Sequence, residues 1–75
     1  MTNVCILIRV LRGKGLKVLN GLKKLPQVKS AHLVLGRYDV VAFAETRTYK
    51  AVAALSLKVN AIEGIKSSET LVEVA

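Results

Sequence analysis

The chain has 75 residues, 52% of them apolar, and 12 lysines and arginines against five aspartates and glutamates give a net charge of +7. A domain of this length buries only about 60% of the surface of its unfolded chain, and the apolar fraction excludes a disordered chain. One cysteine and one histidine exclude a disulfide framework and disfavour a metal site. Oligomerisation is therefore the expected source of additional stability.

The charge and hydropathy patterns also bear on location and partners. No apolar segment is long enough to span a membrane. Residues 4–11 contain Arg9 and follow no basic leader, so they indicate a strand and not a signal peptide. The basic residues would attract anions, but they are scattered and accompany no recognition helix or aromatic platform. We expect a cytoplasmic domain with a solvated basic surface, no specific DNA binding by itself and no membrane partner.

Taken in chain order, the apolar pattern predicts six elements. They are a strand at residues 4–11, a helix at 14–25, strands at 28–35 and 40–45, a helix at 48–60 and a strand at 65–74.

The two halves of the chain form an internal repeat. In each helix, apolar residues recur at i, i+4 and i+7, so one face of each helix is buried. A duplicated βαβ unit predicts an α+β fold of the ferredoxin-like type, βαββαβ, with a four-stranded antiparallel sheet and two helices on one face. The apolar positions that repeat at a spacing of 37 are Val18, Leu22, Leu25 and Val28 in the first half and Leu55, Val59, Ile62 and Ile65 in the second.

The predicted strands are apolar on both sides. Val4, Ile6 and Ile8 point to one side of the first strand, whereas Leu7 points to the other, and residues 40–44 are all apolar. Both helices cover the same face of such a sheet, so the other face needs a cover of its own. We expect a second copy, laid sheet against sheet about a twofold axis to form a dimeric α+β barrel.

The sequence contains no recognisable catalytic motif. His32 has no nucleophile or carboxylate placed beside it, and Cys5 lies within an apolar strand, where a thiol behaves as a small hydrophobe. Gly13 and Gly15, which flank Lys14, lack the remaining positions of a phosphate-binding loop and indicate a flexible turn. We predict no catalytic residue, no cofactor and no metal ligand.

Two polar segments are candidates for ligand binding. The first is Gly-Arg-Tyr-Asp at residues 36–39, a short hairpin turn between the second and third strands. Tyr38 offers an amphipathic ring, and Asp39 can accept hydrogen bonds or pair with a cation. Turn chemistry alone, with Asp39 bonded to the nearby backbone, is an equal interpretation. The second segment holds Ser67, Ser68 and Thr70 at the start of the last strand, which solvated edge residues would explain equally well.

Several segments together carry a family resemblance. They are Gly15, Leu25-Pro26-Gln27-Val28, Gly36-Arg37-Tyr38-Asp39-Val40, Ile62-Glu63-Gly64-Ile65, and Ser67 to Thr70 leading into Leu71-Val72. Over nearly its whole length, the chain resembles the C-terminal effector-binding domain of the Lrp/AsnC, or feast/famine, regulators, which is also known as the RAM domain. The hairpin pattern Gly-x-Tyr-Asp is the most specific part of the resemblance.

The resemblance implies one RAM/ACT-like effector-binding domain over residues 1–75. It also implies dimers formed through the open sheet face, association of four dimers, and an amino-acid effector bound between dimers. An amino acid needs oxygen acceptors for its ammonium group and N–H or hydroxyl donors for its carboxylate. The implied crevice lies where Gly36, Tyr38 and Asp39 of one dimer meet Ser67, Ser68 and Thr70 of a neighbouring one.

The expected role follows from what the resemblance covers. Full-length members of the family place a helix-turn-helix domain before this one, whereas here the first strand begins within a few residues of Met1. We therefore expect a stand-alone module of the demodulin kind, which binds amino acids alone or joins a full-length Lrp/AsnC regulator in transcription regulation.

Two alternatives stay open. A small dimeric α+β barrel enzyme would use His32 or Tyr38. A non-specific nucleic-acid-binding protein would use the basic surface and would lose affinity steeply with salt.

Overall fold

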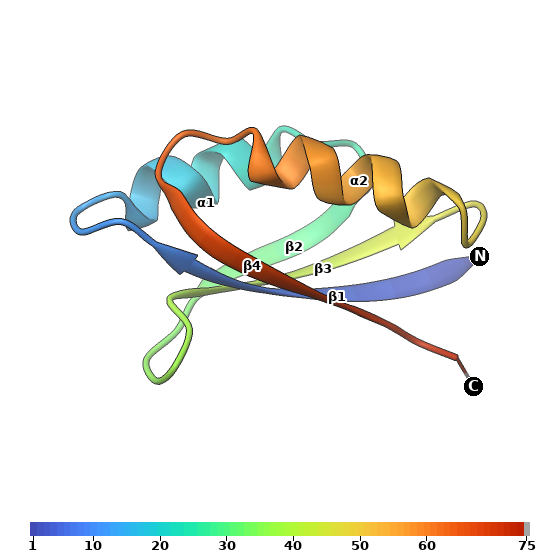
Figure 1. Cartoon of the computed structure of the whole chain (residues 1–75), viewed down its shortest axis with the longest axis horizontal. Coiled ribbons are helices and arrows are strands. Elements are labelled where there is room, and N and C mark those ends of the chain that lie inside the picture. Colours follow the sequence, from blue (N-terminus) through green and yellow to red (C-terminus); the bar gives the residue numbers. More distant parts are fainter. Residues whose placement is uncertain (75) are drawn as a thin grey trace.

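A computed structural model describes residues 1–74 of the chain. The strands form one antiparallel sheet in the order β2-β3-β1-β4, and both helices lie on the same side of it (Figure 1). The predicted ferredoxin-like α+β fold is confirmed. The elements are β1 (Thr2–Val10), α1 (Gly15–Lys23), β2 (Val28–Leu33), β3 (Val40–Thr46), α2 (Ala51–Asn60) and β4 (Ile65–Val72).

The hydrophobic core lies between the two helices and one face of the sheet. Strand side chains alternate between faces, whereas helical side chains return to the same face every three or four residues, so each element offers the core one apolar row. The predicted buried faces of both helices and of β1 are confirmed. The core residues are Val4, Ile6, Ile8, Val18, Leu22, Ala31, Val40, Ala42, Ala44, Val52, Leu55 and Val59.

The internal repeat is visible in the backbone as well as in the sequence. After α1, Leu25 N–H donates to Leu22 O and Val28 N–H donates to Leu25 O, both at 3.0 Å. The same two bonds recur after α2 in the segment 59–65, at 3.0 and 3.4 Å. Both halves therefore leave their helix through the same turn and enter the next strand in the same way.

Several boundaries differ from the predicted ones for local reasons. β2 ends at Leu33 and not at residue 35, because Val34 N–H donates to Asp39 O at 2.9 Å and so starts the hairpin. α2 begins at Ala51 and not at residue 48, because Thr48 lies in the preceding turn, where its hydroxyl accepts a hydrogen bond from Ala51 N–H at 3.2 Å. Smaller shifts occur at β1, at both ends of α1, at the end of β3 and at the end of β4.

The face of the sheet opposite the helices has no covering element in the described chain (Figure 1). It carries an apolar strip across its three adjacent strands β3, β1 and β4. Phe43 on the inner strand β3 is 47% exposed, and Leu71 on the edge strand β4, which also pairs with Cys5, is 46% exposed. The prediction that β1 and β3 are apolar on both sides is confirmed. The strip consists of Cys5, Leu7, Val41, Phe43 and Leu71.

None of the described helices is long and apolar enough to cross a membrane.

Candidate functional site

The hairpin that joins β2 to β3 projects below the sheet, on its open side (Figure 1). Its backbone is fixed at two points. Val34 N–H donates to Asp39 O at 2.9 Å, and Asp39 N–H donates to Ile8 O at 2.8 Å. The hairpin is thus attached to the end of β1 as well as to its own strands, which gives residues 36–39 a fixed position beside the open face.

The side chain of Tyr38 connects this hairpin to β4. Its hydroxyl donates a hydrogen bond of 2.7 Å to Glu69 Oε2. Glu69 is paired with Leu7 of the central strand β1, so the tyrosine reaches across β1. The two polar segments, residues 36–39 and 67–70, therefore meet within a single chain, whereas the sequence prediction had them meet between neighbouring dimers.

The same hydrogen bond affects the titration of Tyr38. The bond to the Glu69 carboxylate raises the pKa of the Tyr38 phenol above its usual 10.0, and desolvation and the negative charge of Glu69 add to the increase. The positive charges of Arg37 and Arg9 act in the opposite direction. Both guanidinium groups are thus near enough to the hydroxyl to influence it.

Asp39 is engaged with the backbone of β1. Its Oδ2 accepts a hydrogen bond of 2.9 Å from Val10 N–H, in a partly buried position. Val10 lies where the register between β1 and β4 shifts, so this carboxylate satisfies a donor at an irregular point of the ladder. Within residues 1–74, the second oxygen, Oδ1, makes no hydrogen bond. Backbone bonding thus accounts for one oxygen of Asp39, and a contact with a ligand would use the other.

The three predicted hydroxyl residues do not share a face. Ser67 lies on the open face with Glu69, whereas Ser68 and Thr70 lie on the helix side, because side chains alternate along a strand. The Ser68 hydroxyl donates to Asn60 Oδ1 at the end of α2, at 2.7 Å. The period of two along β4 could have separated these residues in the sequence, and it would have placed Glu69 beside Ser67.

A hollow of about 400 Å³ lies beside the hairpin, lined by Arg9, Gly36, Arg37 and Tyr38. Arg9 is paired with Ser67 across the β1–β4 ladder, which brings that hydroxyl to the same end of the open face. Arg9 was not among the site residues predicted from the sequence. Its position as the one charged residue inside a mainly apolar strand was the available indication.

The structure does not bring the two residues of the enzyme alternative together. His32 lies on the edge strand β2, where its ring packs edge-to-face on Phe43 with 6.3 Å between ring centroids. Tyr38 is directed the other way, across β1 to Glu69. Among residues 1–74, no three histidine, cysteine, aspartate or glutamate side chains gather closely enough to hold a metal ion. The arrangement offers hydrogen-bond donors, acceptors and charge, which suits binding.

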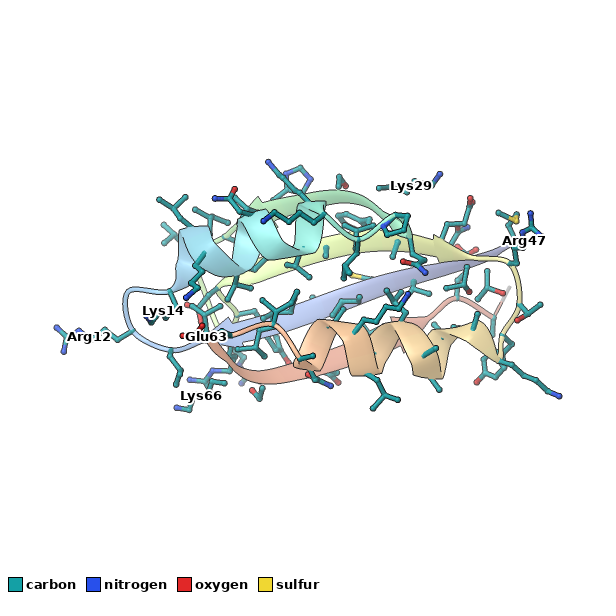
Figure 2. All side chains as sticks on the ribbon, turned by 90° about the horizontal axis from the view of Figure 1, so that it is seen from above. Arg12, Lys14, Lys29, Arg47, Glu63 and Lys66 are labelled. Atoms are coloured by element: carbon teal, nitrogen blue, oxygen red, sulfur yellow. The ribbon has the colours of Figure 1, made fainter. Side chains whose placement is uncertain are left out.

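The basic residues that can be placed do not gather in one stripe. Two of the lysines have carboxylate partners, since Lys17 pairs with Glu63 at 3.0 Å and Lys29 with Glu45 at 3.7 Å. A nucleic-acid groove would need a stripe of cations that follows the phosphate backbone. Figure 2 shows instead that the labelled basic residues lie at opposite ends of the molecule, with Arg12, Lys14 and Lys66 at one end and Lys29 and Arg47 at the other.

Solved structures of other proteins share this architecture. Hypothetical protein PHS023 from Pyrococcus horikoshii is 29% identical, with a TM-score of 0.90, over 100% of this chain and 92% of that one. FFRP-DM1 is 29% identical, with a TM-score of 0.92, over 99% of this chain and 100% of that one. The transcriptional regulator NMB0573 from Neisseria meningitidis, solved as a complex with L-Met, is 16% identical with a TM-score of 0.87. This chain covers only 50% of that regulator, and the likeness is one of fold.

Comparison with curated proteins finds no match. The sequence pattern of the Lrp/AsnC ligand binding domain, however, matches residues 3–74, which include both the hairpin and the start of β4. The resemblance carried by the hairpin and by the two helix-ending turns is therefore confirmed, and the chain belongs to the Lrp/AsnC ligand-binding domain family.

Proposed function

We propose that the chain is a regulatory module that binds a small amino-acid effector and assembles through its open sheet face. The observation that carries this proposal is the meeting of Tyr38 with β4 at one end of that face, because it joins two segments far apart in the sequence into one polar site. Membership of a family of ligand-binding domains supports the binding role. The L-Met complex of the Neisseria regulator supports an amino acid as the class of ligand.

Self-association is the first part of the proposal. Phe43 on the inner strand β3 and Leu71 on the edge strand β4 are each nearly half exposed on this face, beside the half-buried Val41 and Leu7. A contiguous apolar strip of this kind is unfavourable in water, and a second copy laid against it would bury both strips at once. The hairpin projects from the end of the face and not from its centre (Figure 1), so it leaves room for the partner. Association of four such dimers is part of the same proposal.

The effector site is the second part. We place the ligand at the hairpin end of the open face, in contact with Gly36, Tyr38, the free oxygen of Asp39 and Ser67. Ser68 and Thr70 point to the helix side of β4, so they would contribute only to a ligand that also reaches round the edge of that strand. A neighbouring dimer would close the site, since the hollow beside the hairpin is open to solvent.

The biological role is the third part. A module of this kind would act by changing its assembly when the effector binds, alone or together with a full-length Lrp/AsnC regulator, and it would do so in the cytoplasm without catalysing a reaction. Effector and assembly must then be linked, each favouring the other by the same factor.

Size-exclusion chromatography with light scattering tests this function. We expect a dimer or a larger species without ligand, and a shift in mass when the effective amino acid is added from a panel. A folded monomer at micromolar concentration would contradict the proposed assembly. A mass and a melting temperature that no amino acid changes would contradict the proposed effector binding, since any ligand that binds the native state stabilises it.

A further inference from the structure

The hollow beside the hairpin is lined by two arginines and by no carboxylate. Arg9 projects from β1 and Arg37 from the hairpin, and they face the same volume of about 400 Å³ together with Gly36 and Tyr38. The size is within the range of sites for small ligands, which runs from about 300 to 1,000 Å³. Any ligand in this hollow therefore meets two guanidinium groups.

Neither arginine has an ion-pair partner within residues 1–74, where the two salt bridges are formed by lysines. Each of the two nearby carboxylates has one oxygen bonded to a group other than these arginines. Glu69 accepts the hydrogen bond of the Tyr38 hydroxyl, and Asp39 Oδ2 accepts that of Val10 N–H. The guanidinium groups thus keep their donors available for a ligand.

We infer that the preferred effector carries two carboxylates, so that it is an acidic amino acid and not a neutral one. This inference rests on the proposed function and names its ligand class. The planar guanidinium group matches a carboxylate with two parallel hydrogen bonds. An acidic amino acid supplies one carboxylate for Arg9 and one for Arg37, and its ammonium group would extend beyond the lining of the hollow toward Asp39, which follows Tyr38 in the hairpin and keeps one oxygen without a hydrogen bond. A neutral amino acid would leave one guanidinium group facing the hollow without a partner.

Calorimetric titration of the full chain with four amino acids tests the inference. Glutamate and aspartate are compared with glutamine and asparagine, which have the same shape but only one carboxylate. We expect each acid to bind about tenfold or more tightly than its amide, because a charge-assisted bond is added. Arg9→Gln and Arg37→Gln should each reduce that preference severalfold, and the double variant should abolish it.

Arg47→Gln is the matched control, because it also removes one exposed positive charge. Arg47 follows the far end of β3, roughly 20 Å from the hairpin by the length of that strand, and it is labelled at the end of the molecule opposite Arg12 in Figure 2. The acid preference should survive this substitution. If Arg47→Gln lowers it as much as Arg37→Gln does, the preference reflects overall charge and the inference is wrong.

Two further outcomes separate this inference from the proposed function. Equal or tighter binding of the amides would overturn the acidic specificity and leave an amino-acid-binding module standing. Binding of no amino acid would overturn both. Light scattering on the same variants tests whether the arginines hold the assembly together. If Arg9→Gln or Arg37→Gln dissociates the assembly without any amino acid present, the arginines pair with a neighbouring copy. The assignment of the hollow to a ligand would then be wrong.

Discussion

Substitutions of Asp39 can distinguish its structural role, the hydrogen bond to Val10, from its proposed role in ligand binding. Replacing it with alanine removes the acceptor of Val10 N–H and leaves a partly buried donor without a partner. Loss of such a bond lowers the free energy of unfolding by about 1–3 kcal/mol. For a domain of this size, each kcal/mol corresponds to a shift of about 4–8 °C, so the melting temperature should fall by roughly 5–20 °C.

Asp39→Asn separates the two roles. An asparagine retains a side-chain carbonyl that can accept the bond from Val10 N–H, so most of the stability should return. It carries no negative charge, however, so it should not restore a contact with the ammonium group of an effector. We expect the Asp39→Asn variant to be nearly as stable as wild type in urea denaturation but to bind the amino acid about tenfold or more weakly in calorimetry.

The comparison requires equal protein concentrations, because the stability of an oligomer depends on concentration. If Asp39→Ala melts at the wild-type temperature, the bond to Val10 contributes nothing and the structural role assigned to Asp39 is wrong. If Asp39→Asn binds the effector as tightly as wild type, the carboxylate does not hold the ammonium group.

Three other perturbations test separate parts of the fold and the site. Ala42→Asp should unfold the protein, because Ala42 is fully buried under the helices, whereas Val41→Asp should dissociate the assembly and leave the circular dichroism of the fold intact; unfolding by both or by neither would contradict the two-faced sheet. Gly64→Ala should lower the melting temperature more than Gly13→Ala. Both glycines have positive φ (+103° and +78°), but a Cβ at Gly64 would lie 2.8 Å from a neighbouring side-chain carbon, whereas one at Gly13 would meet nothing within 4 Å. Because the pKa of Tyr38 is raised above 10.0 by its hydrogen bond to the Glu69 carboxylate, this bond stabilises the fold between neutral pH and pH 10 and is lost as the pH rises through the folded-state pKa. Tyr38→Phe should therefore be less stable than wild type near neutral pH, with a gap that closes at strongly alkaline pH; a gap constant over the whole range would argue against the bond.

Much of the fold could be predicted from residue spacing. The positions of Val18 and Leu22 on one helical face follow from the helical period, and the two-sided apolar character of β3 is visible in residues 40–44. These predictions succeed because the spacing of apolar residues along a helix or a strand shows directly which of its faces is buried. The end of β2 was harder to locate. Leu35 continues an apolar run, but it is fully exposed, since the backbone turns into the hairpin at Val34.

The candidate site could be predicted only in part. The hairpin stands out through its residue types, but its contact with Glu69 joins positions 31 apart in the sequence, and no local period encodes such a pairing. Ser67 and Ser68 were grouped because they are neighbours in the chain, although the strand sends them to opposite faces. Arg9 was overlooked for a related reason. Its role depends on the position of Arg37, which only the folded hairpin supplies.

The location of the effector site is the central claim, and backbone amide chemical shifts measured by NMR during an amino-acid titration test it most directly. Binding at the proposed site should shift the amides of residues 36–39, of Arg9 and of residues 67–69, and it should leave the opposite end of the sheet around Arg47 unchanged. Saturable shifts centred on that opposite end, around Gln27 and Arg47, or no shifts anywhere with any amino acid, would contradict the account.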